Sequence, residues 1–175
     1  RAKPDDPATA REYAGLGSGH ELGVFSGHSS NASAVAFGPD GRFAVSVAWD
    51  ATVRAWDVES RLCVSVLEGH TNNLSAVCLT PSGRQVVSAG VDRDIKLWDL
   101  KARRVLRQFA GHEAEVTALA FTPDGRHLVS AARDKTVRVW EVASGKCERV
   151  LSHTAAVLAV ALTPGGSGLL SAVAD

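Results

Sequence analysis

A repeat of about 42 residues, marked at four separate places, constrains this chain more than any other feature. The dipeptide Gly-His ends at His28, His70 and His112, and a Ser-His variant ends at His153. Trp-Asp begins at residues 56 and 98, Trp-Glu begins at residue 140, and an Asp precedes each of these tryptophans by six residues. A Pro-Asp-Gly turn or a variant of it recurs at 39–41, 81–83, 123–125 and 164–166. Because four independent markers keep one spacing, the chain is built from a single structural unit that occurs several times.

Between the markers the chain carries short apolar runs that predict β-strands. Residues 43–48 and 128–131 are rich in β-branched and small apolar side chains, and residues 136–140 alternate with period two. Such runs, bounded by tight turns, predict antiparallel strands joined by hairpins. Each repeat holds four runs, and no segment shows a sustained helical period. A four-stranded sheet of this size must stack on its neighbours to bury its faces. In the second repeat the predicted strands cover roughly 75–79, 85–90, 94–98 and 104–109.

The spacing and the marker residues resemble the WD-repeat (WD40) family over about residues 21–175. The resemblance implies an all-β fold, a β-propeller of four-stranded antiparallel blades. About four repeats are present, fewer than the roughly seven common in such rings, so we expect an incomplete ring and an excerpt of a longer chain. Two alternatives stay open: a ring closed by pairing of chains, or a small four-bladed ring that joins residues 8–26 to 157–175.

The ends of the chain fit the repeat less well than its middle. The position equivalent to Trp56 is Ala14, so a strand there is expected to be weak or absent. Gly19-His20 lies out of register and is interpreted as a turn. We expect a polar N-terminal segment at 1–20 that is poorly ordered or a degenerate strand. The propeller segment follows at 21–175. It comprises the last strand of one blade, three full blades over 28–151 and the first half of another blade at 152–175.

Each repeat also contains a His, a Ser and an Asp, which taken alone invite a hydrolase hypothesis. Repetition argues against it, because a nucleophile needs one substrate pocket and one oxyanion hole. In the WD-repeat family these residues and the signature Trp form a buried hydrogen-bonded tetrad in each blade. Such a set satisfies every polar group, since His can donate to Asp and accept from a hydroxyl that itself accepts from the indole. The resemblance implies the structural tetrads His28, Ser46, Asp50, Trp56; His70, Ser88, Asp92, Trp98; His112, Ser130, Asp134, Trp140; and the partial set His153, Ser171, Asp175.

Residues that differ between repeats mark a candidate binding surface. The resemblance implies that partners often bind the rim of loops at one end of the central channel, where the residue before each tetrad Asp points outward. Trp49 is the first candidate, because Trp in a tight turn suits the core poorly and Trp and Arg dominate interface hot spots. Packing of this Trp against an adjacent blade is the alternative interpretation. The candidate rim positions are Trp49, Val91, Arg133 and Ala174, with Asn31, Asn73, Glu115 and Ala156 from the loops after each Gly-His.

Composition bears on the kind of partner and on the compartment. The formal net charge is zero, which argues against nucleic acid or an anionic membrane as the partner. The basic stretch at 101–104, with Arg107 beyond it, is interpreted as a solvated turn and, less readily, as a nucleic-acid patch. The three cysteines form no CxxC pair and are expected to be core thiols in a reducing, cytoplasmic setting.

These observations favour a binding module over an enzyme. No phosphate loop, nucleophile elbow or metal-ligand cluster is present in the sequence, so we expect no cofactor and no metal. The expected function is a non-enzymatic scaffold or sensor module that binds a protein partner within a larger signalling or regulatory protein. A propeller that binds a small ligand or glycan is the alternative, and a propeller enzyme is the third. Open propeller edges would allow self-association.

Overall fold

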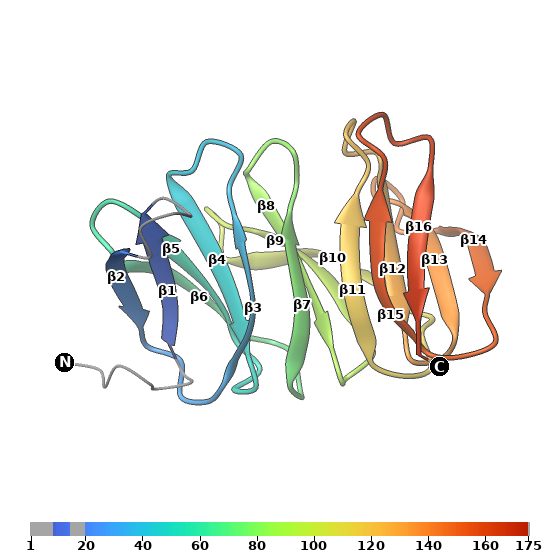
Figure 1. The fold of residues 1–175 in the computed structure, drawn as a ribbon, viewed down its shortest axis with the longest axis horizontal. Helices are drawn as coiled ribbons and strands as arrows, with labels where there is room; N and C mark the ends of the chain where they lie inside the picture. The colour runs from blue at the N-terminus through green and yellow to red at the C-terminus, as the bar shows by residue number, and fades with distance from the viewer. Residues whose placement is uncertain (1–8, 15–19, 175) are drawn as a thin grey trace.

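The computed structural model describes residues 9–14 and 20–174, with side chains from residue 23 onward. Every element in these ranges is a β-strand, and the strands form a series of separate antiparallel sheets along the chain (Figure 1). The prediction of an all-β fold is therefore confirmed. No helix that is long and apolar enough to cross a membrane occurs among these residues.

Three of the sheets are complete four-stranded blades whose strands pair in chain order. Blade I consists of β3 (Ala32–Phe37), β4 (Phe43–Ala48), β5 (Val53–Asp57) and β6 (Cys63–Leu67). Blade II consists of β7 (Leu74–Leu79), β8 (Gln85–Gly90), β9 (Ile95–Asp99) and β10 (Arg104–Phe109). Blade III consists of β11 (Val116–Phe121), β12 (His127–Ala132), β13 (Thr136–Glu141) and β14 (Cys147–Ser152). The strands of blade II begin and end within one residue of the predicted ranges.

A two-stranded sheet flanks the blades at each end. Strands β1 (Thr9–Ala14) and β2 (His20–Ser26) form the outer half of a blade, and β15 (Val157–Leu162) and β16 (Leu169–Val173) form an inner half. Figure 1 shows the two half-blades at opposite ends of a fan of stacked sheets. The described strands thus form an open arc, and the predicted incomplete propeller is confirmed.

The N-terminal half-blade corrects one expectation, the turn at Gly19-His20. Strand β1 lies in the segment where the sequence predicts poor order or a degenerate strand, and it pairs with β2 as β5 pairs with β6. Loss of the signature Trp does not prevent this pairing, because the ladder needs only backbone groups. His20 is not in a turn: it begins β2 and pairs with Ala14. Further along β2, Phe25 packs on Trp56 with ring centroids 5.7 Å apart, so this half-blade covers the face of blade I.

The apolar core lies between blades. One cluster joins Val45 of blade I to Leu74 and Trp98 of blade II, and the next joins Phe109 of blade II to Trp140 of blade III. Both tryptophans are fully buried. Each signature Trp therefore faces the preceding blade, and burial of such a large side chain is a major contribution to holding neighbouring blades together.

A β-bulge recurs near the start of the innermost strand of every blade. The register shifts at Ser33, Ser75, Thr117 and Leu158. A bulge turns the extra side chain away from the regular ladder. In the three complete blades the hydroxyl so displaced donates to a backbone carbonyl of the next sheet: Ser33 Oγ to Leu74 O at 2.6 Å, Ser75 Oγ to Val116 O at 2.9 Å, and Thr117 Oγ1 to Val157 O at 2.7 Å.

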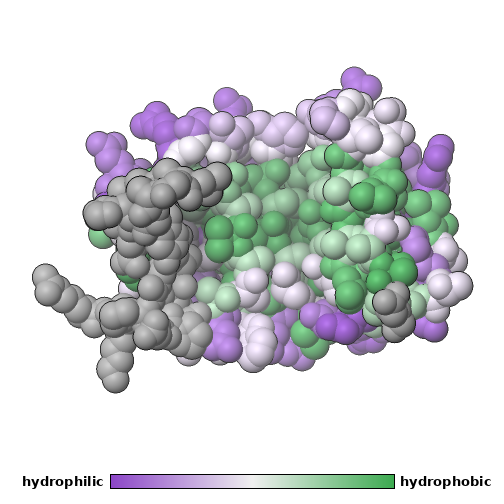
Figure 2. All heavy atoms as spheres, viewed as in Figure 1, coloured by the Kyte–Doolittle hydropathy of each residue, from purple (hydrophilic) through white to green (hydrophobic). Residues whose placement is uncertain are grey.

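The innermost strands form a face on which apolar side chains gather. Figure 2 shows this zone over β3, β7 and β11, with hydrophilic residues along the upper and lower rims. Val35 and Phe37 of β3 are about half exposed. The side chains that can form hydrogen bonds or ion pairs with a partner therefore lie mainly on the two rims, which are formed by the turns between strands.

One of the three cysteines, Cys63, corrects a further expectation, whereas Cys78 and Cys147 pack against the apolar core between blades II and III. Cys63 is exposed at the start of the outermost strand β6, and Cys147 is only partly buried at the start of β14. These positions lie at the outer edge of a blade, where no further strand covers them. Cys78 in the inner strand β7 is also only partly buried by surface area, yet burial raises the pKa of its thiol to about 12. The expectation of core thiols is therefore wrong for Cys63, which is exposed.

Candidate functional site

The first tetrad lies inside blade I, where the loop before β3, strand β4, the following turn and strand β5 meet. His28 Nδ1 donates to Asp50 Oδ2 at 3.0 Å, and the Ser46 hydroxyl donates to His28 Nε2 at 2.7 Å. The indole N–H of Trp56 donates to the same Ser46 oxygen at 2.8 Å. These roles follow because a carboxylate can only accept, which places the imidazole proton on Nδ1. Every polar group in the set is thereby satisfied.

The other two complete blades repeat this geometry. In each, one His contacts an Asp through Nδ1 and a Ser through Nε2, and the Trp indole donates to that Ser. In blade II the distances are 2.7 Å for His70–Asp92, 2.8 Å for His70–Ser88 and 2.8 Å for Trp98–Ser88. In blade III they are 2.7 Å for His112–Asp134, 2.7 Å for His112–Ser130 and 2.8 Å for Trp140–Ser130.

The fourth set is only partly within the described residues. His153 Nε2 lies 2.8 Å from Ser171 Oγ, and its Nδ1 lies 3.2 Å from the carbonyl oxygen of Leu151. Both His153 and Ser171 are half-buried. The predicted member Asp175 lies outside the described residues.

The tetrad serines are unsuited to nucleophilic catalysis. Ser46 is 1% exposed, and Ser88 and Ser130 are 0% exposed. Each hydroxyl oxygen already accepts an indole N–H and donates to an imidazole, so a substrate could reach it only after the blade opened. The arrangement therefore suits a role inside the sheet, where it ties the β4, β8 or β12 strand to the following strand and to the Gly-His loop.

The tetrads of blades I and III hold a neutral imidazole against a charged carboxylate. Burial lowers the pKa of His28 and of His112 below the ordinary value, although the aspartate that each contacts acts in the opposite direction. Burial alone would raise the pKa of Asp50, but hydrogen bonds from Thr52, from the Ser29 N–H and from His28 outweigh it and lower this pKa to about 2. At neutral pH the network thus carries one buried negative charge that is fully hydrogen-bonded.

The predicted rim residues come together in pairs on one end of the blades. In every repeat the residue before the tetrad Asp donates its backbone N–H to the carbonyl of the residue in the loop after Gly-His. The structure therefore presents the two variable positions of each blade side by side. The pairs are Trp49–Asn31 at 2.9 Å, Val91–Asn73 at 2.8 Å, Arg133–Glu115 at 2.9 Å and Ala174–Ala156 at 2.8 Å.

The side chains on this constant backbone differ in chemistry. Trp49 is 51% exposed, which is unusual for so large an apolar side chain and leaves half of its surface available for contact. Val91 is also exposed. Arg133 Nε donates to Glu115 Oε2 at 2.7 Å, so blade III presents an ion pair where blade I presents an indole.

Sequence reasoning missed two sets of residues. The bulge hydroxyls of Ser33, Ser75 and Thr117 repeat every 42 residues, and that recurrence of a hydroxyl residue was a signal for them. A groove between blades I and II was also missed. Its signal was a departure from the repeat: Ser65 stands where the next two repeats have Arg107 and Arg149.

Comparison with known proteins identifies the family to which the repeats belong. The model of the family described as WD domain, G-beta repeat matches residues 19–57, 61–99 and 103–141, and these matches together span more than half of the chain. Each ends at the Trp-Asp or Trp-Glu pair, the position at which β5, β9 and β13 end. No curated protein matches the chain significantly. The repeat matches and the stacked four-stranded blades agree, and the chain belongs to the WD-repeat family.

Proposed function

We propose that this chain is a non-enzymatic protein-binding module that acts as a scaffold or sensor within a larger signalling or regulatory protein. WD repeats generally serve as scaffolds for protein–protein interaction. The rim that carries Trp49 is the proposed docking surface. The three cysteines are all free, which supports a reducing, cytoplasmic setting.

The observation that carries this proposal is the contrast between a constant rim backbone and variable rim side chains. Trp49, Val91 and Arg133 occupy equivalent positions and make equivalent backbone hydrogen bonds, yet they offer an aromatic ring, an aliphatic group and an Arg–Glu ion pair. Identical small ligands bound once per blade would need identical side chains. One asymmetric protein surface fits the variation better, with the half-exposed indole as its anchor.

The test replaces Trp49 with Ala and measures folding and capture separately. We expect the free energy of unfolding to change by less than about 1 kcal/mol, because half of the side chain is already in water. The set of proteins that the immobilised chain retains from a lysate, measured by quantitative mass spectrometry, should lose its most enriched members.

The matched control is Leu62→Ala, which removes an exposed apolar side chain from the turn between β5 and β6, away from the rim. This variant should retain the same proteins as the wild type. A large loss of stability in Trp49→Ala would instead show that the indole packs against a neighbouring blade, and unchanged capture with unchanged stability would overturn the proposed rim.

A further inference from the structure

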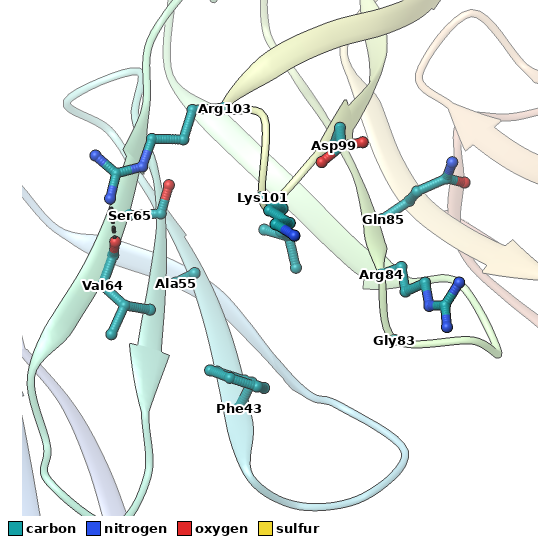
Figure 3. A pocket seen from close by; sticks show the side chains of 11 residues that line it. Phe43, Ala55, Val64, Ser65, Gly83, Arg84, Gln85, Asp99, Lys101 and Arg103 are labelled. Carbon is teal, nitrogen blue, oxygen red and sulfur yellow. Dashed lines mark hydrogen bonds between the residues drawn. The ribbon is translucent and has the colours of Figure 1, made fainter.

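A groove of about 670 Å³ lies between blades I and II at the end opposite to Trp49. One wall comes from blade I, with Phe43, Ala55, Val64 and Ser65, and the other comes from the β7–β8 and β9–β10 turns of blade II. Figure 3 shows Arg103 of blade II reaching toward Val64 and Ser65 of blade I, with Arg84 on the opposite side of the groove and its side chain directed away from Phe43. The Trp49 turn follows β4, whereas Phe43 begins it, so the groove and the proposed rim are separate surfaces.

The groove is open because blade I has small residues at two positions where blade II has large ones. Ala55 and Ser65 correspond in the repeat to Leu97 and Arg107. At the next junction the Arg107 side chain crosses from blade II to blade III, and its Nη1 donates to the Ser144 carbonyl at 2.7 Å. No such side chain leaves the Ser65 position, so the equivalent space between blades I and II stays free.

Ser65 brings an unused hydrogen bond to this space. The residue is only 6% exposed, and its hydroxyl has no hydrogen-bond partner among the described residues. A buried hydroxyl without a partner is unfavourable, so a ligand group that pairs with it would gain binding free energy. A serine hydroxyl can donate to a carbonyl or carboxylate oxygen of a ligand that reaches it.

The charges around the groove are mostly positive. Arg84 and Lys101 are exposed at its mouth, and Arg103 closes one end by donating from Nη2 to the Val64 carbonyl at 2.8 Å. The one acidic lining residue, Asp99, accepts the backbone N–H of Ala102 at 2.7 Å and so caps its own turn. The basic stretch that the sequence assigns to a solvated turn thus supplies one wall of a recessed site.

We propose that this groove binds a short extended peptide segment of a protein partner, in which an apolar side chain is flanked by carboxylates. The apolar side chain packs on Phe43 and Val64, the carboxylates pair with Arg84 and Lys101, and a main-chain carbonyl accepts the Ser65 hydroxyl. A peptide fits better than nucleic acid because the cations occupy one wall only and the facing wall is apolar, whereas a phosphate backbone is bound through a longer track of cations.

Selection from a phage-displayed library of random dodecapeptides on the full chain tests the proposal directly. Sequences in which Leu, Ile or Phe stands between Asp and Glu should be enriched. A fluorescein-labelled synthetic copy of the most enriched peptide should bind more weakly as salt rises, since the cations at the mouth are exposed. Selection that yields no acidic sequences overturns the proposal.

Variants assign the binding to the groove. Ser65→Arg should weaken the labelled peptide at least about tenfold, because the new side chain fills the space as Arg107 does at the next junction. Arg84→Glu should also weaken it about tenfold by placing like charges opposite each other. The matched control is Arg126→Glu, the same change one repeat later, which should leave the affinity within about twofold. Trp49→Ala should leave peptide binding unchanged, which separates this site from the rim.

Arg84 is exposed, so Arg84→Glu remains decisive even if Ser65→Arg fails to fold. Equal losses from Arg84→Glu and Arg126→Glu would overturn the proposal in favour of a general charge effect. Displacement of the peptide by a single-stranded oligonucleotide that itself loses affinity in Ser65→Arg would overturn it in favour of a nucleic-acid groove.

Discussion

Blade II and the C-terminal half-blade contain the same His–Ser pair in very different surroundings. The His70–Ser88 and His153–Ser171 distances are both 2.8 Å, so two strands and one loop are enough to set this hydrogen bond. In blade II the Trp98 indole and the Asp92 carboxylate complete the set, and His70 and Ser88 are buried, whereas His153 and Ser171 are half-buried. The geometry of the pair is therefore local, and its contribution to stability depends on the strands and blades that exclude water from it.

The largest effect is expected when the Asp92 carboxylate is removed from the tetrad of blade II. Asp92→Ala leaves the His70 imidazole and the Thr71 N–H without their acceptor. We expect the free energy of unfolding to fall by about 3 kcal/mol, because the buried His70 imidazole loses its partner. Urea denaturation followed by Trp fluorescence measures the loss. Asp92→Asn, which keeps an acceptor oxygen, should cost less, and an unchanged midpoint in Asp92→Ala would refute a stabilising role for the tetrad.

Acid should weaken the complete blades in two stages. In the folded chain the pKa of His28 and of His112 is lowered from the ordinary value of 6.5. Below about pH 6.5 the unfolded chain therefore binds more protons than the folded chain, and the free energy of unfolding decreases as pH falls. The pKa of Asp50 is lowered from 3.8 to about 2, so a second loss begins as pH approaches 4. After allowance for solvent screening we expect about 1 kcal/mol from Asp50.

Urea unfolding between about pH 3 and pH 8 checks this acid response. The unfolding free energy should be nearly constant above about pH 7 and decrease below it. A chain that becomes more stable on mild acidification would show that the tetrad histidines bind protons more tightly when folded, which contradicts the effect of burial.

The smallest expected effect belongs to the half-blade. His153→Ala should lower the free energy of unfolding by no more than about 0.5 kcal/mol, because a half-buried side chain loses contacts that water can replace. His70→Ala, measured by the same denaturation, is the matched comparison and should cost several times more. Equal losses would show that the His–Ser pair stabilises a blade without burial.

Much of the fold could be predicted because one structural unit of about 42 residues recurs along the chain. The strands of blade II lie within one residue of the expected ranges, and the members of each complete tetrad lie at the positions that the repeat marks. The prediction was wrong at His20, which begins β2 and is not part of a turn. Ala14 stands in place of the signature Trp, and β1 pairs with β2 through main-chain groups.

The sequence by itself determined the periodic parts of this protein: four strands per repeat, the polar set inside each blade, and the rim positions that vary. Their spacing follows from strand and turn lengths, which are local properties of the chain. Only the tertiary structure decided what happens between blades. The hydrogen bond from Ser33 to the next sheet joins residues that are far apart in the chain. The same holds for the groove beside Ala55 and Ser65, and for the Arg107 contact that fills the equivalent space between blades II and III. At these positions side-chain volume departs from the repeat, and packing alone converts the difference into a contact or a cavity.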